Sequence, residues 1–144
     1  MKSKLFAIRN QTIDVDLAIL LIRIVCGLAF IQHGFGKIQH PLTWMGPEAT
    51  IPAIFQALAA ISEFGGGIAL VLGFLTRLGA FGIGCTMTVA VIMHGFIFGD
   101  PFVNLTGGHS FEPAIVYLVI AILLMIIGPG RFSLDRIIFG LNNQ

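Results

Sequence analysis

The chain has 144 residues, of which 56% are hydrophobic and only 10% charged, and its mean hydropathy is +0.95. About a quarter of the residues are charged in a typical soluble domain, so this composition excludes an ordinary soluble globule. The eight Lys and Arg against seven Asp and Glu leave a net charge of +1, which is too little to neutralise a run of phosphates. The composition therefore predicts one membrane domain over residues 1–144, in contact with the lipid bilayer, and excludes nucleic acid as a partner.

Four apolar runs, separated by turn residues, dominate the sequence. A bilayer core about 30 Å thick needs about 20 apolar residues in a helix, and the runs predict transmembrane helices at about 17–36, 53–74, 78–98 and 113–128. The prolines lie between the runs or at their ends, where a missing backbone N–H is tolerated. We therefore expect an all-α, integral membrane four-helix bundle.

A short amphipathic segment follows the fourth run. Gly128, Pro129 and Gly130 end the helix, and Ser133 is placed to cap a further one. Residues 132–141 mix apolar and charged side chains, which predicts a short helix that lies along the membrane interface.

The distribution of Lys and Arg predicts the orientation of the bundle. If all four runs span, the N-terminus, the second connection and the C-terminus share one side, and Lys37 stands alone on the other. The basic residues of the first side are Lys2, Lys4, Arg9, Arg77, Arg131 and Arg136. Because positive charge is retained in the cytoplasm, we expect both termini there, with the loops 38–52 and 99–112 facing outward. The first run is too long for a signal-peptide core and no A-x-A site follows it, so we expect an uncleaved anchor.

Ionisable side chains occur inside the predicted spans. Each costs about 2.5–3.5 kcal/mol on insertion scales, so each needs a partner, a water-filled cavity or a function. Arg23, His33 and Lys37 share one face of the first helix, and Gln56 and Glu63 share a face of the second. Counting the helical rise from the cytoplasmic ends puts Arg23 at about 9 Å and Glu63 at about 16 Å, which predicts an Arg23–Glu63 ion pair. The pair either joins the two helices or takes part in proton-linked or ligand contacts, and the alternative is that Arg23 and Glu63 have separate partners.

Two histidines lie at matched depth in the predicted bundle. His33 and His94 both come out about 24 Å above the cytoplasmic boundary, near the outer leaflet, where they could face each other. Such a pair could hold a haem iron or a metal. The alternative is that each hydrogen-bonds a carbonyl group, a glutamine or Glu112, and the sequence itself assigns no metal ligands.

Polar and aromatic residues gather at the outer end of the predicted bundle. The polar ones in the outer loops are His40, Trp44, Glu48, Asp100, Asn104, His109 and Glu112. The aromatic ones are Phe30, Phe35, Trp44, Phe96, Phe98, Phe102 and Phe111. An outward-opening pocket with aromatic walls would suit an amphipathic ligand such as a quinone head group. The same aromatic residues also fit an ordinary interfacial belt.

The two cysteines do not predict a redox pair. Cys26 and Cys85 lie at similar depths, but Cys85 is nine residues from His94 and therefore on the opposite side of its helix. If His94 faces inward, Cys85 faces lipid. The sequence also lacks a CxxC motif.

With these residues in place, the chain resembles the DoxX family of small four-helix prokaryotic membrane proteins over about residues 20–139. The resemblance rests on motifs in a fixed order, which are Leu21-Ile-Arg-Ile, His33-Gly-Phe-Gly-Lys37, Glu63-Phe-Gly-Gly-Gly67, Gly73-Phe-Leu-Thr-Arg77 and Gly128-Pro-Gly-Arg-Phe-Ser-Leu-Asp135. It implies a bundle in the cytoplasmic (inner) membrane of a bacterium or archaeon. It also implies an association with membrane oxidoreductase systems, among them a thiosulfate:quinone oxidoreductase and an oxidative-stress complex with superoxide dismutase and a sulfurtransferase.

Three functions stay open at this stage. The first is a membrane subunit of a redox system that binds a quinone-like or sulfur-compound ligand near the outer leaflet, with a partner redox subunit supplying electrons. The second is a non-catalytic scaffold or small-molecule carrier, and the third is a haem protein. A homo-oligomer is compatible with each, and no catalytic residue is assigned. The candidate ligand-binding residues are Arg23, His33, Lys37, Glu63, His94 and Glu112.

Overall fold

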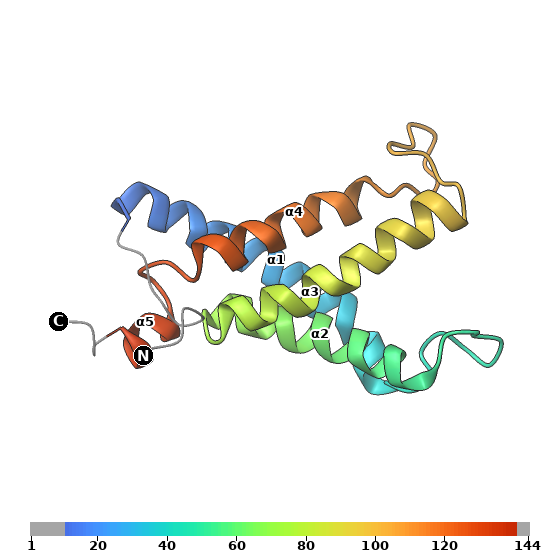
Figure 1. Ribbon diagram of the computed structural model, residues 1–144, viewed down its shortest axis with the longest axis horizontal. Helices are drawn as coiled ribbons and strands as arrows, with labels where there is room; N and C mark the ends of the chain where they lie inside the picture. Colours follow the sequence, from blue (N-terminus) through green and yellow to red (C-terminus); the bar gives the residue numbers. More distant parts are fainter. Residues whose placement is uncertain (1–10, 141–144) are drawn as a thin grey trace.

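The computed structural model describes residues 11–140, and every regular element in this range is a helix (Figure 1). The elements are α1 (Ile13–Gln39), α2 (Ala53–Leu72), α3 (Thr76–Val91), the π-helix η2 (Ile92–Ile97), α4 (Glu112–Ile127) and α5 (Leu134–Phe139). Each predicted run forms a helix, so the all-α class is confirmed. Of the predicted features, Lys2, Lys4, Arg9 and Leu141 lie outside the described residues.

Length and composition support membrane crossing for two of these helices. They are Ala53–Leu72 and the continuous helix Thr76–Ile97, which α3 and η2 form together. The apolar helix α4 has 16 residues and is thus about 24 Å long, against a hydrocarbon core of about 30 Å. α1 has 27 residues, extends beyond its predicted run at both ends and carries charged side chains in its first and last turns.

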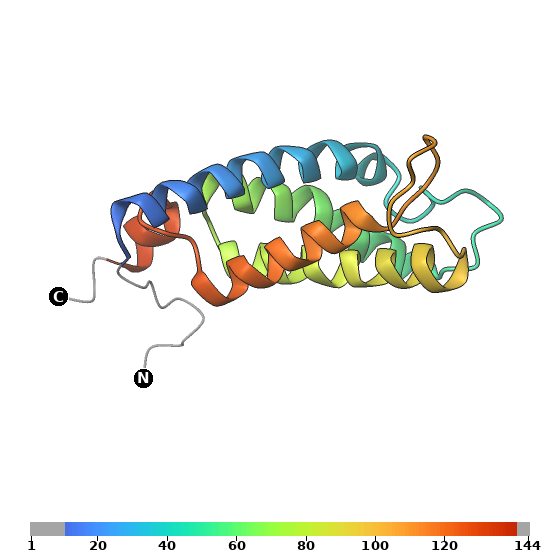
Figure 2. The ribbon, with the colours of Figure 1, turned by 90° about the horizontal axis from the view of Figure 1, so that it is seen from above.

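Contacts between glycines fix how α1 packs against α2. A Cβ atom added to Gly67 would lie 2.7 Å from the backbone nitrogen of Ile31 and 2.8 Å from the carbonyl oxygen of Gly27. The two backbones therefore touch at this point, as small residues allow. Farther along α1, Gly34 lies directly against the backbone of Phe64. α2 packs in turn against α3, and α3 against α4 (Figure 2).

We expect Gly67→Ala to lower the stability of the bundle by about 1–3 kcal/mol, because the added methyl group meets backbone atoms that cannot rotate away. Gly65→Ala is the matched control, since a Cβ atom at Gly65 would meet nothing within 4 Å. Thermal unfolding in detergent measures both variants. Equal unfolding temperatures for Gly67→Ala and Gly65→Ala would show that the close approach is absent.

The two ends of the bundle differ. The α1–α2 pair and the α3–α4 pair diverge toward the end that carries the loops 40–52 and 98–111 (Figure 1), which we call the open end. The buried residues of α3 and α4 all lie toward the other end, which we call the closed end. They are Thr76, Ala80, Ile83 and Gly84 in α3 and Ala121 and Leu124 in α4. Side chains on the inner faces of α3 and α4 are thus less covered toward the open end.

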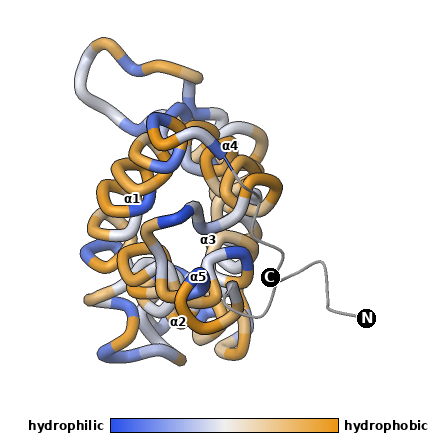
Figure 3. The backbone as a smooth tube through the Cα atoms, turned by 90° about the vertical axis from the view of Figure 1, so that its left-hand side faces the viewer, coloured by the Kyte–Doolittle hydropathy of each residue, from blue (hydrophilic) through white to orange (hydrophobic). Residues whose placement is uncertain are grey.

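The short helix α5 covers the closed end (Figure 3). The Ser133 hydroxyl accepts a hydrogen bond from the backbone N–H of Arg136 at 3.2 Å, which confirms Ser133 as the helix cap. The Asp135 carboxylate accepts hydrogen bonds from the backbone N–H groups of Leu75 at 2.8 Å and Thr76 at 3.0 Å. Because these N–H groups begin α3 and lack helical partners, Asp135 ties the C-terminal segment to the start of α3.

Candidate functional site

Arg23 binds backbone carbonyl groups at the closed end. Its Nε donates to the carbonyl of Leu70 at 2.9 Å, and its Nη1 donates to the carbonyls of Pro129 at 2.6 Å and Phe132 at 2.8 Å. The last carbonyls of a helix have no helical donor and carry partial negative charge, so a guanidinium is stabilised beside the last turn of α2. The predicted Arg23–Glu63 ion pair is wrong.

Arg77 performs the same task for α4. Its Nε donates to the carbonyl of Met125 at 3.0 Å, and its Nη2 donates to the carbonyl of Ile127 at 3.3 Å. Two arginines therefore bind the C-terminal turns of α2 and α4. Arg23 belongs to the framework of the closed end, away from the other predicted site residues.

Glu63 pairs with Lys37 instead. The Lys37 Nζ lies 2.6 Å from both carboxylate oxygens, and the Glu63 side chain is 5% exposed against 25% for Lys37. The glycine contacts explain this pairing, because Gly34 lies against Phe64 and the next turn of α1 brings Lys37 beside Glu63. Glu63 is thus buried inside the bundle with a cation beside it, as an ionisable side chain in an apolar helix requires.

Trp44 and Gln56 complete the surroundings of Lys37. The centre of the Trp44 ring lies 4.5 Å from the Lys37 Nζ, within the range of a cation–π contact. The Trp44 Nε1 donates to the backbone carbonyl of Gln56 at 2.9 Å, and the Gln56 Oε1 accepts from the backbone N–H of Met45 at 3.2 Å. The buried Gln56 thus holds the loop 40–52 in place, and this loop holds Trp44 over Lys37.

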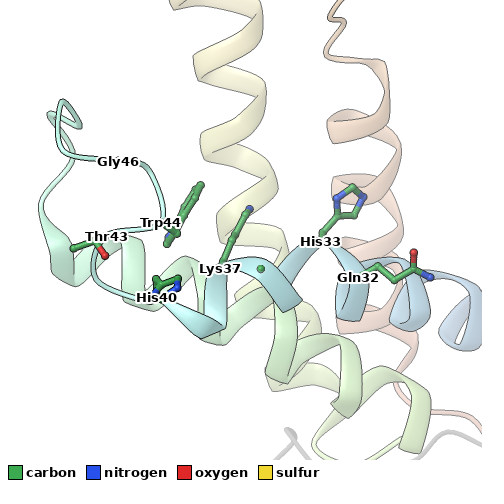
Figure 4. Close-up of a pocket in the computed structure, with 8 residues that line it drawn as sticks. Gln32, His33, Lys37, His40, Thr43, Trp44 and Gly46 are labelled. Carbon is green, nitrogen blue, oxygen red and sulfur yellow. The ribbon is translucent and has the colours of Figure 1, made fainter.

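A pocket of about 670 Å³ opens beside this group (Figure 4). It is lined by Gln32, His33, Gly36, Lys37, His40, Thr43, Trp44 and Gly46. His33, Lys37 and His40 supply nitrogen atoms that can donate hydrogen bonds, and Trp44 supplies a flat apolar surface. None of the lining residues carries a carboxylate, so the pocket favours a ligand rich in hydrogen-bond acceptors.

His33 marks the level at which the interior of the bundle becomes accessible. It follows Phe30 by about one helical turn and lies near the same face of α1. Phe30 is 1% exposed and contacts the Tyr117 ring of α4 edge-on, with 5.0 Å between ring centres. His33 is exposed, and its ring centre lies 6.1 Å from that of Phe30. The contact between Phe30 and Tyr117 therefore fills the interior of the bundle one helical turn from His33, on the side of the closed end.

His94 and Glu112 lie elsewhere at the open end. The His94 Nδ1 is 2.7 Å from the Asp100 Oδ2, and the ring centre of His94 lies 6.1 Å from that of His109. Within residues 11–140, His94 and His33 thus have different ring neighbours and make no ring contact with each other, which does not support the predicted facing pair. Glu112 begins α4 and is not among the residues that line the pocket.

Most of the predicted aromatic wall is absent from the pocket. Trp44 lines it and Phe30 lies buried below it, whereas four other members are exposed on the outside. These four are Phe35, Phe96, Phe98 and Phe102. Cys26 is buried and Cys85 exposed, so Cys85 faces outward as its rotation on the helix predicts.

Comparison with known proteins shows that the chain is similar to several membrane proteins of bacteria. The sequence pattern of the DoxX family matches residues 18–95. Inner membrane protein YqjF of Escherichia coli is 34% identical over 130 residues, which cover 85% of this chain and 93% of that protein. Inner membrane protein YphA of E. coli is 33% identical over 132 residues, which cover 82% and 88%. An uncharacterized membrane protein of Mycobacterium tuberculosis is 30% identical over 133 residues, which cover 83% and 80%. No solved structure matches the chain.

Proposed function

Because this chain belongs to the DoxX family of membrane proteins, we propose that it spans the inner membrane and binds the head group of a quinone-like ligand at its open end. The observation that carries the proposal is the buried Glu63 carboxylate, which holds Lys37 at the wall of a pocket. All four long helices cross the bilayer in this proposal, the open end faces outward and both termini lie in the cytoplasm.

The surface of the bundle supports this placement. Large apolar side chains are exposed along the outer faces of the long helices, as lipid contact requires. Examples are Leu21, Val25 and Leu28 in α1, Ile54 and Ile61 in α2, Phe81 and Val89 in α3, and Val119 and Ile126 in α4. Arg77 and Arg131 lie at the closed end and Lys37 at the open end, and this excess of positive charge supports a cytoplasmic closed end.

The chemistry of the pocket suits a quinone. A quinone offers two carbonyl oxygens as acceptors on a flat ring. The Lys37 ammonium has three N–H donors, and two serve the Glu63 oxygens, which leaves one for a ligand. The His33 imidazole adds a second donor, and the Trp44 indole can stack on the ring. A sulfur oxyanion offers similar acceptors without the flat ring and is the alternative ligand of the same site.

The role that follows is that of a membrane subunit in a redox system. The chain would position the carrier and exchange protons with it through His33 and the Lys37–Glu63 pair. Electrons would come from a partner subunit, since the sequence has no CxxC pair.

A second candidate is a membrane scaffold without a ligand. It is favoured by the contacts of Arg23 and Arg77. The hydrogen bonds described above for these two residues go to backbone carbonyl groups at helix ends, which is a structural role. In this case the Lys37–Glu63 pair serves only to join α1 to α2, and the pocket holds water.

Fluorescence separates the two candidates, because Trp44 is the single tryptophan of the chain and lines the pocket. A bound quinone would contact the indole and quench its emission. We therefore expect saturable quenching when ubiquinone or menaquinone is added to the purified protein in nanodiscs. Thiosulfate, added in competition, tests the sulfur-oxyanion alternative.

Substitutions at the pocket wall provide the control. His33→Ala and Lys37→Gln are expected to weaken quinone binding about tenfold or more, which corresponds to the loss of a hydrogen bond in a partly buried site. His109→Ala is the matched variant, since it removes an exposed imidazole of the outer side that does not line the pocket. The ligand site does not exist if the wild type shows no saturable quenching, or if folded His33→Ala, Lys37→Gln and His109→Ala all bind like the wild type.

A further inference from the structure

The loop 98–111 between η2 and α4 contains no strand but doubles back and is closed at its base by backbone hydrogen bonds; we call it the hairpin. The backbone N–H of Phe111 donates to the carbonyl of Pro101 at 3.3 Å, and the N–H of Glu112 donates to the carbonyl of Phe102 at 3.0 Å. The rings of Phe102 and Phe111 pack together across the hairpin, with their centres 5.4 Å apart. The two arms of the loop are therefore joined by both backbone and side-chain contacts.

The tip of the hairpin is held by its own side chains. The Asn104 Oδ1 accepts from the backbone N–H of Thr106 at 2.9 Å, and the Asn104 Nδ2 donates to the carbonyl of His109 at 3.2 Å. This turn pushes Leu105 outward to an exposed fraction of 92%. Val103 is also exposed, so a prearranged turn presents apolar side chains away from the protein.

The hairpin combines exposed apolar side chains with an absence of acidic and basic residues. Residues 101–111 contain no Asp, Glu, Lys or Arg. Exposed apolar side chains in a cluster usually mark a surface that contacts a partner or a membrane. The cluster continues onto the end of η2, where Phe96, Ile97 and Phe98 are exposed.

The direction of the hairpin points to the kind of partner. The loop 40–52 continues along the long axis of the bundle, whereas the hairpin leaves this axis and reaches to the side (Figure 1). Figure 3, which looks along the bundle, shows a loop projecting beyond the ring of helices. Since the helices cross the bilayer in the proposed function, a sideways projection at the end of η2 runs along the membrane surface above the surrounding lipid.

We propose that the exposed apolar side chains of this hairpin, Phe102, Val103 and Leu105, insert into the outer membrane–water interface and anchor the open end of the protein in lipid. Apolar and aromatic side chains partition into this interface, and the tip carries no formal charge that would oppose entry. The inference needs only the membrane placement of the bundle and does not depend on a ligand in the pocket.

A tryptophan at the tip tests the proposal. In a Trp44→Phe background, Leu105→Trp places the single fluorophore at the most exposed apolar position of the hairpin. The protein is reconstituted in vesicles of phosphatidylcholine with and without bromine on the acyl chains. We expect blue-shifted emission that brominated lipid quenches strongly and aqueous iodide quenches weakly.

The matched control is Glu48→Trp in the same background, because Glu48 is an exposed residue of the loop 40–52. Iodide is expected to quench the emission of Glu48→Trp. Brominated lipid is expected to quench it several-fold less than it quenches the emission of Leu105→Trp. Iodide quenching of Leu105→Trp equal to that of the control would place the tip in water and overturn the proposal. Protection from both quenchers would show that protein covers the tip, which also overturns it. If Trp44→Phe does not fold, Leu105→Trp is made with Trp44 retained. The difference in quenching between this variant and the wild type then reports on position 105.

Discussion

Replacing Arg23 by methionine is expected to lower the free energy of unfolding by about 3–5 kcal/mol, the range seen when one partner of a buried charged network is removed. The methionine side chain fills similar space but leaves the carbonyls of Pro129 and Phe132 without the guanidinium donor, and the Leu70 carbonyl keeps only the N–H of Gly73. Buried acceptors without partners carry the full desolvation penalty. Unfolding in detergent, followed by circular dichroism, measures the loss.

Two further variants show whether the guanidinium geometry matters. Arg23→Lys keeps the charge, but one ammonium cannot reach carbonyls on both sides of the flat guanidinium, so an intermediate loss is expected. Arg131→Met is the comparison, since the Arg131 side chain is 54% exposed and its Nε lies 3.4 Å from the Asp16 carboxylate. The buried Asp16 keeps its hydrogen bond from the backbone N–H of residue 131 in this variant, so a smaller loss is expected. Losses of equal size for Arg23→Met and Arg131→Met would refute the assigned role of Arg23.

Replacing Lys37 by methionine is expected to destabilise the bundle by about 3 kcal/mol, because the Glu63 carboxylate then stays buried with no cation beside it. The double variant Lys37→Met/Glu63→Met removes both charges and should recover most of this loss. The same unfolding measurement applies. Simple additivity of the two single losses in the double variant would mean that Lys37 and Glu63 do not interact.

The double variant also separates stability from ligand binding. It is expected to fold well and to bind quinone poorly, since the pocket loses its fixed ammonium group. If the double variant is stable and binds quinone with the wild-type affinity in the fluorescence titration, the Lys37–Glu63 pair is a purely structural contact and the scaffold is favoured.

The periodic apolar runs were sufficient to predict the helices but not all of their boundaries. α1 begins at Ile13 rather than near residue 17. Its first turn carries Asp14 and Asp16, and the buried Asp16 carboxylate accepts a hydrogen bond from the backbone N–H of Arg131. A hydropathy pattern places the boundary of the apolar run at Asp16, although the helix extends beyond this residue toward the N-terminus. Two of the helices are both long and apolar enough to span a membrane, and the crossing of all four long helices is part of the function proposed above.

The sequence identified the polar residues of the site better than their partners. Helical spacing predicted the face of α1 that carries His33 and Lys37 and the face of α2 that carries Glu63. Helical spacing did not predict the partner of Glu63. The register of α1 against α2 depends on the contact of Gly27 with Gly67, and a depth counted along each helix separately does not include this contact. Sequence reasoning also missed Gln56 as the residue that holds the loop 40–52, although its place on the Glu63 face was a signal.

Labelling of a cysteine at position 33 tests the central claim most directly. In a Cys26→Ala/Cys85→Ala background, His33→Cys should react with a membrane-impermeant maleimide added to intact cells whose outer barrier is permeable to it. Saturating quinone should slow this reaction in purified protein. Thr12→Cys, at the exposed start of α1, should react only after the membrane is opened. Labelling of position 33 only from the cytoplasmic side, or at a rate that quinone leaves unchanged, would contradict an outward-facing ligand pocket.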